Sequence, residues 1–281
     1  MIVVLHPGIY SSIQDLGRSG FAHIAMPSGG AMDVYSATVA NQLLRNTSTA
    51  AVLEMTFGGA QLQFEKEVCI CLTGADFNPT INGVVIAMNT VIKVVKGSVL
   101  SFGNKRYGVR TYLAVAGGFD TAVVLKSRSF YTGVTEMSQL VKGDRLLVQP
   151  SEAIVARTQA KLKVHKEHFS SRMLSVSQGP EFELLSEKQQ AVLLQTVFTI
   201  SNDNNRVGYR LEASLKNSMQ PILTSGVLPG TVQLTPSGTL LVLMRDCQVT
   251  GGYPRVLQLC ETAINCLAQK STTDRIQFVL S

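Results

Sequence analysis

Short apolar runs separated by turn signals dominate the chain. Residues 110–116 alternate as a strand does, with Thr111, Leu113 and Val115 on one face. Pairs of glycines, or Pro-Gly, recur between such runs. Many short strands at this spacing predict a mainly β fold made of barrels or sandwiches, not a doubly wound sheet. The clearest predicted strands are 91–95, 110–116 and 240–244.

Three stretches have the pattern of a helix. Residues 33–44 repeat apolar side chains every fourth position, and Asp33 stands where an N-cap belongs. Residues 186–189 read Ser-Glu-Lys-Gln, which has the form of a capping box ahead of an apolar run. Residues 261–270 place apolar side chains on one face. A mainly β chain with a few short helices is expected.

The composition changes between residues 150 and 172, where lysines become frequent and strand-like runs are few. This stretch predicts a connector with a boundary near residue 155, so that 1–155 and 156–281 form two domains. His165 and His168 lie in this polar stretch, and we expect both to face solvent.

Composition and charge narrow the possible partners. The 281 residues include 25 Lys+Arg and 19 Asp+Glu, a net charge of +6 that is spread along the chain. Nucleic-acid binding needs a basic patch, and the sequence has none. No apolar run approaches the roughly 18 residues of a spanning helix, and the start lacks a signal peptide, so a cytoplasmic protein is expected. The 5 cysteines have no metal-type spacing, and we predict buried thiols and no metal site.

Several standard motifs are absent. The sequence contains no Walker-type phosphate loop, no GxGxxG dinucleotide fingerprint and no GxSxG elbow. Residues 87–89 read Ala-Met-Asn, without the lysine that biotin attachment needs, so we expect no covalent biotin on this chain.

What remains is a set of arginines and acids in Gly-rich turns. A guanidinium binds a carboxylate or phosphate through two parallel hydrogen bonds, and adjacent glycines let a ligand approach the backbone. The set therefore suits an anionic or amide-bearing small molecule. The alternative is that each Arg–acid pair is an internal ion pair that holds a turn.

At these residues the sequence resembles the KipA-like family, also called allophanate hydrolase subunit 2 or the C subunit of 5-oxoprolinase. The family is similar to part of the carboxyltransferase region of urea carboxylase. Matching motifs span nearly the whole chain. They include Gln-Asp-Leu-Gly-Arg-Ser-Gly at 14–20, Gly-Ala-Met-Asp at 30–33, Leu-Thr-Gly-Ala-Asp at 72–76, Tyr-Leu-Ala-Val-Ala-Gly-Gly at 112–118, Arg-Val-Gly-Tyr-Arg-Leu-Glu at 206–212 and Thr-Gly-Gly-Tyr-Pro at 250–254.

The resemblance implies two cyclophilin-like β-barrel domains with a few short helices. It also implies that the chain works with a KipI-like B subunit and a LamB/YcsF-like A subunit to open 5-oxoproline to glutamate. ATP with Mg²⁺ would be used by the complex. Two other functions stay open: a regulatory protein that antagonises a KipI-like kinase inhibitor, and a carboxyltransferase component of a urea-carboxylase or allophanate-type pathway.

The matching motifs also supply the candidate site residues. Some candidates have an alternative structural role. Asp33 can be a helix N-cap, and Tyr209 and Tyr253 can be packing residues. Gly251 and Gly252 can simply form a turn. The family's glycines are largely missing from residues 126–139, which puts the substrate in question more than the fold. No general base is assigned. The catalytic candidates are Asp15, Arg18, Glu54, Arg206 and Arg210, and the substrate-binding candidates are Gln14, Asp33, Arg110, Arg128, Tyr209, Gln233, Thr250, Gly251, Gly252 and Tyr253.

Overall fold

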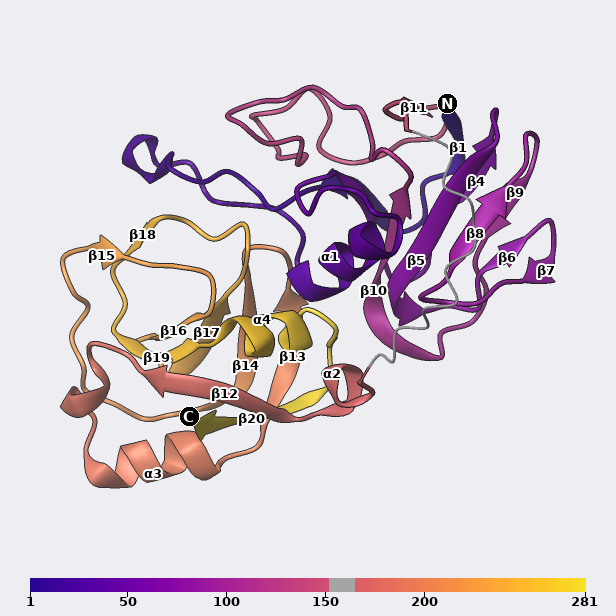
Figure 1. Ribbon diagram of the computed structural model, residues 1–281. Helices are drawn as coiled ribbons and strands as arrows, with labels where there is room; N and C mark the ends of the chain where they lie inside the picture. The colour runs from indigo at the N-terminus through magenta and orange to yellow at the C-terminus, as the bar shows by residue number, and fades with distance from the viewer. Residues whose placement is uncertain (152–164) are drawn as a thin grey trace. The chain divides into compact units, whose positions relative to one another are not determined.

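The computed structural model describes residues 1–151 and 165–281 (Figure 1). The chain folds into two compact units: Met1–Gly17 joins Asp33–Phe169 in the first, and Arg18–Met32 joins Ser170–Ser281 in the second. The predicted domain boundary at residue 155 lies outside the described residues and stays a prediction.

The first unit contains two antiparallel sheets. Apolar side chains from both sheets form its core, which includes Ile13, Leu53, Phe64, Leu72 and Leu113. The six-stranded sheet has the order β11 (Arg145–Leu146), β1 (Ile2–His6), β4 (Gln61–Phe64), β9 (Val99–Ser101), β6 (Thr80–Ile81) and β7 (Val84–Val85). The five-stranded sheet has the order β2 (Tyr10–Gln14), β3 (Val52–Thr56), β10 (Tyr107–Val115), β5 (Val68–Asp76) and β8 (Val91–Val94).

Helix α1 (Val34–Leu43) packs against β5 and β10 of the five-stranded sheet. The prediction that Asp33 caps it is confirmed, because Asp33 Oδ1 accepts a hydrogen bond of 3.1 Å from the Ser36 backbone N–H. Thr73 on β5 donates to the Ser36 carbonyl at 2.7 Å, which ties the helix to the sheet. A second helix, α2 (Glu167–Ser170), lies in the stretch predicted as a connector.

The second unit is built around a closed barrel (Figure 1). Only β12 and β20 pair in parallel, and the other neighbours are antiparallel. Apolar side chains such as Leu174, Phe198, Val232 and Val242 fill the core. The strands follow the order β12 (Met173–Gln178), β19 (Arg255–Leu259), β16 (Thr231–Leu234), β17 (Thr239–Leu243), β14 (Gly208–Ser214), β13 (Phe198–Asn204) and β20 (Arg275–Leu280).

Short elements complete the second unit. The capping box predicted at residues 186–189 is confirmed at the start of α3 (Glu187–Gln195), where the Ser186 and Gln189 side chains each bond the other's backbone N–H. The helix predicted over 261–270 is α4 (Glu261–Leu267). The remaining elements are a two-stranded ribbon of β15 (Ser225–Gly226) and β18 (Thr250–Gly251) and the 3₁₀ turns η1 (Ala22–Ile24) and η2 (Phe182–Leu184).

The predicted mainly β fold with a few short helices is therefore confirmed, with a closed barrel in the second unit. No helix among residues 1–151 and 165–281 is long and apolar enough to cross a membrane.

Candidate functional site

A cavity of about 250 Å³ lies on the outer face of the barrel in the second unit. The alternation of β14 explains how polar side chains reach it. Tyr209 and Leu211 point into the barrel core and are buried, whereas Gly208 and Arg210 have the opposite orientation and line the cavity. The strand therefore divides its residues between packing and a polar surface.

Strand register places two predicted site residues in one row. Arg210 on β14 is opposite Leu241 on β17, and Leu241 is opposite Gln233 on β16. Neighbouring strands lie about 4.8 Å apart, so the Arg210 and Gln233 backbones are separated by roughly 10 Å with Leu241 between them. Leu241 and Leu243 form an apolar part of the wall. The cavity thus has an apolar floor with a polar group on each side.

The segment that follows β17 supplies the rest of the wall. Gly251, Gly252 and Tyr253 line the cavity together with Arg210 and Gln233. All five were predicted site residues. Thr250, also predicted, pairs with Gly226 in the β15–β18 ribbon, is exposed and is not part of the cavity lining.

Arg210 is the cation of this cavity. Its side chain is 47% exposed and its Nε donates to Asp203 Oδ2 at 2.9 Å. Among the described residues, neither terminal amino group of Arg210 has a hydrogen-bond partner. These two donors lie in a plane and can bind both oxygens of a carboxylate.

Three cavity residues with polar side chains were not among the candidates: Asp203, Asn205 and Gln248. Asn205 Oδ1 accepts from the backbone N–H groups of Val207 and Gly208 at 2.8 and 3.3 Å, so this side chain shapes the turn before β14. Asn205 directly precedes the motif that begins at Arg206, and this position could have marked it as a site residue. Nothing in the sequence marks Asp203 or Gln248.

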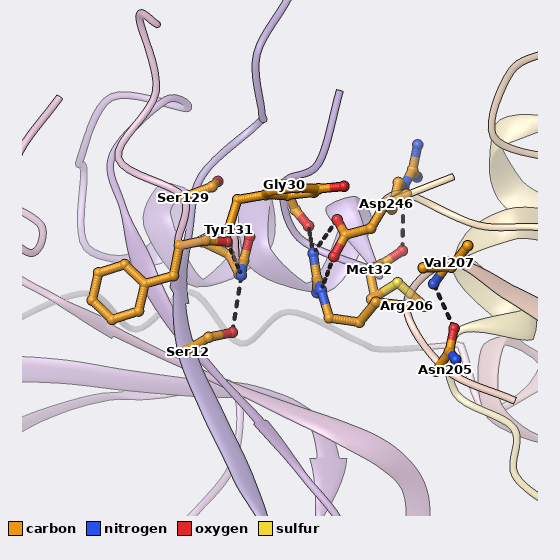
Figure 2. Close-up of polar contacts among 12 residues, drawn as sticks. Ser12, Gly30, Met32, Ser129, Tyr131, Asn205, Arg206, Val207 and Asp246 are labelled. Carbon is orange, nitrogen blue, oxygen red and sulfur yellow. Dashed lines mark hydrogen bonds and ion pairs between the residues drawn. The ribbon is translucent and has the colours of Figure 1, made fainter. Parts of the chain in front are cut away.

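The other arginine of the same motif has a different environment. Arg206 binds Asp246 through two hydrogen bonds, of 2.7 Å from Nε and 3.0 Å from Nη2, and Nη2 also donates to the Gly30 carbonyl at 2.6 Å (Figure 2). Within the second unit this side chain therefore holds residues 18–32 and the 245–246 turn together.

The remaining candidates in the second unit are also internal. Arg18 is buried, and its backbone N–H donates to the Ser28 carbonyl at 2.6 Å. Tyr209 lies in the barrel core, and its hydroxyl donates to the Lys270 carbonyl at 3.3 Å. The location of Tyr209 therefore matches the packing role that was the alternative to ligand binding.

In the first unit, three candidates form a buried polar network. Glu54 on β3 accepts a hydrogen bond of 2.8 Å from the Tyr112 hydroxyl and lies 3.9 Å from Arg110 Nε. The same hydroxyl accepts from the Asp33 backbone N–H at 2.8 Å. Asp33 Oδ2 in turn lies 2.7 Å from His168 Nε2. Register explains the grouping, because Tyr112 is directly opposite Glu54.

Burial of this network has an electrostatic consequence. Desolvation, followed by the nearby charges of Glu54 and Asp33, raises the pKa of Tyr112 well above its ordinary value. Tyr112 is therefore a neutral hydroxyl that both donates and accepts. Every member of the network is buried.

The prediction that His168 faces solvent is wrong. The side chain is buried against Asp33. Its ring packs in a tilted contact with Tyr35 and edge-to-face with Phe169, at centroid distances of 5.2 and 4.9 Å. Helix α2 turns the ring inward, which the polar neighbours of His168 in sequence do not reveal. His165 is exposed, as expected.

Gln14, Asp15 and Arg128 belong to a third group, around the loop at 127–129. The Asp15 carboxylate accepts from Ser127 Oγ at 2.6 Å, Ser129 Oγ at 2.7 Å and the Arg128 backbone N–H at 2.6 Å. These contacts anchor the loop to the end of β2. The Arg128 side chain turns away, toward Asp120 at 3.1 Å.

The buried Gln14 amide donates to Ser12 Oγ at 2.9 Å and to the Phe130 carbonyl at 3.4 Å. The loop at 127–129 is therefore held by side chains on both sides. Across the described part of the chain, no cluster of three or more His, Cys, Asp or Glu residues is placed to hold a metal ion.

Comparison with known proteins agrees with this architecture. A family model described as "Carboxyltransferase domain, subdomain A and B" matches residues 24–280. The chain is 31% identical to the C subunit of 5-oxoprolinase from Escherichia coli (strain K12) over 285 residues, which cover 99% of this chain and 91% of that protein.

Two solved structures extend the comparison. The crystal structure of Kluyveromyces lactis urea carboxylase superposes with a TM-score of 0.89 and 27% identity, covering 99% of this chain and 27% of that one. The structure of TTHA0988 superposes with a TM-score of 0.84 and 27% identity, covering 99% of this chain. This chain spans 55% of the TTHA0988 chain, so both solved proteins contain substantial regions without a counterpart here.

Proposed function

Because the chain belongs to the carboxyltransferase domain family, subdomains A and B, we propose that it is one subunit of an ATP-dependent 5-oxoprolinase. The enzyme opens the lactam ring of 5-oxoproline to give glutamate. The observation that carries the proposal is the similarity to the C subunit of 5-oxoprolinase over nearly the full length of both chains. A KipI-like B subunit and a LamB/YcsF-like A subunit complete the complex.

The cavity of the second unit supports a role in holding the substrate. Arg210 presents two terminal amino groups to a carboxylate, and Gln233 presents an amide on the other side of Leu241. A substrate held at both ends over an apolar floor has few orientations, which favours reaction at one bond. We assign this chain the binding and orientation of 5-oxoproline.

The cavity residues do not fit ATP. Arg210 is the single cation among them, Asp203 places a carboxylate beside it, and no lysine or Gly-rich phosphate loop lines the wall. We therefore assign ATP to the complex and derive no step through a nucleotide on this chain. Water attack on a lactam carbonyl is slow, and ATP supplies its activation when bound elsewhere in the complex.

The proposal is tested by reconstitution. The purified chain, mixed with its KipI-like and LamB/YcsF-like partners, is expected to release glutamate from 5-oxoproline with ATP and none without ATP, measured by chromatography. Leaving this chain out is expected to abolish turnover. Equal glutamate release with and without this chain would contradict the proposal.

A second function is favoured by the fold similarity to urea carboxylase. In that case this chain is a carboxyltransferase component acting with a separate biotinylated protein. Adding bicarbonate and a biotinylated carrier protein to the same mixture distinguishes the two functions, because carboxyl transfer depends on both additions and is blocked by avidin. Turnover of 5-oxoproline that is insensitive to avidin favours the hydrolase.

A further inference from the structure

The side-chain amide of Gln233 has unused hydrogen-bonding capacity at the cavity wall. The residue is 1% exposed, and its one hydrogen bond to a described residue is long: Nε2 donates to the Tyr253 carbonyl at 3.4 Å. Its Oε1 accepts from no described residue. Oε1 is not among the buried polar atoms that lack a hydrogen-bond partner, so solvent reaches it from the cavity. A ligand that displaces this solvent can complete the hydrogen bonds of the amide.

A neighbouring glycine preserves the space that this amide occupies. A Cβ atom added at Gly251 would lie 2.5 Å from Gln233 Nε2, closer than real contacts allow. Gly251 does not have the positive φ that would itself require glycine. The absence of a side chain at this position leaves room for the Gln233 amide, which is the end of a flexible side chain and would have to shift if a Cβ atom were added.

The chemistry of a carboxamide defines its complement. Gln233 offers one acceptor, Oε1, beside one donor, Nε2. A ligand satisfies both when it presents an N–H and a C=O on the same side. A lactam does so because its ring forces the amide to be cis, whereas an open-chain trans amide directs the two groups to opposite sides.

We propose that Gln233 is the specificity-determining residue of this cavity and that it recognises the cis-amide of a small lactam. Oε1 accepts from the lactam N–H, Nε2 donates to the lactam carbonyl, and Arg210 binds a carboxylate on the same ring. The ligand class is a five- or six-membered lactam that carries a carboxylate. The inference rests on the proposed function and deepens it, because the ring-opened product lacks the cis-amide and binds more weakly.

The test measures binding to the reconstituted complex by titration calorimetry with three probes. These are 5-oxoproline, which has both groups, 2-pyrrolidinone, which has only the lactam, and cyclopentanecarboxylate, which has only the carboxylate. The wild type is expected to bind 5-oxoproline at least tenfold more tightly than cyclopentanecarboxylate. Gln233→Met, which keeps the volume, is expected to lose this preference while its affinity for cyclopentanecarboxylate stays unchanged.

Two further variants keep the test independent of folding. Gly251→Ala is expected to displace the Gln233 amide and to weaken 5-oxoproline binding about tenfold without changing cyclopentanecarboxylate binding. Gln258→Met is the matched control, because the Gln258 amide is already bonded to Thr231 Oγ1 at 2.8 Å and to the Pro229 carbonyl at 2.8 Å. It is expected to lower the melting temperature and leave the probe preference unchanged.

The outcomes separate this inference from the proposed function. If Gln233→Met and Gly251→Ala retain the wild-type preference for 5-oxoproline, or if the wild type shows none, the inference is overturned. If the preference for 5-oxoproline is lost in Gln233→Met but the wild-type complex releases no glutamate, the lactam site stands and the hydrolase function fails. If glutamate is released and the Gln233→Met complex has wild-type KM and kcat, the hydrolase stands and the lactam site fails.

Discussion

In the first unit, the Glu54 and Arg110 side chains are 0% and 5% exposed, and Tyr112 and Asp33 complete a network closed to solvent. In the second unit, Arg210 is 47% exposed and binds Asp203 through Nε alone. Both regions contain an arginine beside a carboxylate. The two regions differ in their access to solvent, because Glu54 and Arg110 are buried whereas Arg210 is about half exposed and has unused donors. A buried network can only stabilise the fold, whereas exposed donors in a cavity can bind a ligand.

The largest expected effect comes from breaking the closed network. Glu54→Ala removes the acceptor of the Tyr112 hydroxyl and the carboxylate nearest Arg110. Removing one partner of a buried charge pair costs about 3–5 kcal/mol, so urea unfolding is expected to show a loss of that size. Glu65→Ala is the control, since Glu65 pairs with Arg145 at the surface and its loss costs under about 1 kcal/mol. Equal losses in the two variants would contradict the distinction.

A second prediction compares two arginines four residues apart. Arg206→Gln removes the paired hydrogen bonds to Asp246 and the bond to the Gly30 carbonyl, and is expected to lower the free energy of unfolding by about 2–4 kcal/mol. Arg210→Gln removes one exposed ion pair and is expected to change it by under about 0.5 kcal/mol.

For the KM of the complex, the order of the two variants is expected to be the opposite of their order in stability. In the reconstituted complex, Arg210→Gln raises the KM for 5-oxoproline about tenfold to 100-fold, because a carboxylate loses its paired donors. Folded Arg206→Gln keeps the wild-type KM. An increase in KM for Arg206→Gln alone would reverse the roles of the two residues.

How far the sequence predicts these roles depends on distance along the chain. The Asp33 cap and the Ser186 capping box are local, and both were predictable. Arg206 and Arg210 lie in one motif, and nothing local tells them apart. Their roles are set by Asp246, which is 40 residues from Arg206, and by the inward and outward alternation of β14.

Contacts between distant segments were outside the reach of sequence patterns. The His168–Asp33 contact joins residues 135 positions apart, and polar neighbours made His168 look solvent-exposed. The close approach of Gly251 to the Gln233 side chain depends on how the segment after β17 folds over the barrel. The mainly β class follows from alternation along single strands, which explains why the fold was predictable and the composition of the site was not.

The smallest expected effect is a pH dependence in the second unit. A hydrogen bond from Arg255 lowers the pKa of Glu181 below its ordinary value of 4.5. A depressed carboxyl pKa contributes stability above pH 4.5 that is lost as the pH falls through the folded-state value. The difference in unfolding free energy between wild type and Glu181→Gln is expected to stay constant above about pH 5 and to shrink below pH 4.5. A difference that grows on acidification would contradict this assignment.

Hydrogen–deuterium exchange of the reconstituted complex, with and without 5-oxoproline, tests most directly whether the cavity of the second unit is the substrate site. Bound substrate is expected to slow exchange in peptides that contain residues 203–210, 231–234 and 248–253, and to leave peptides around Glu54 and Tyr112 unchanged. Protection confined to the peptides around Glu54 and Tyr112 would contradict the account.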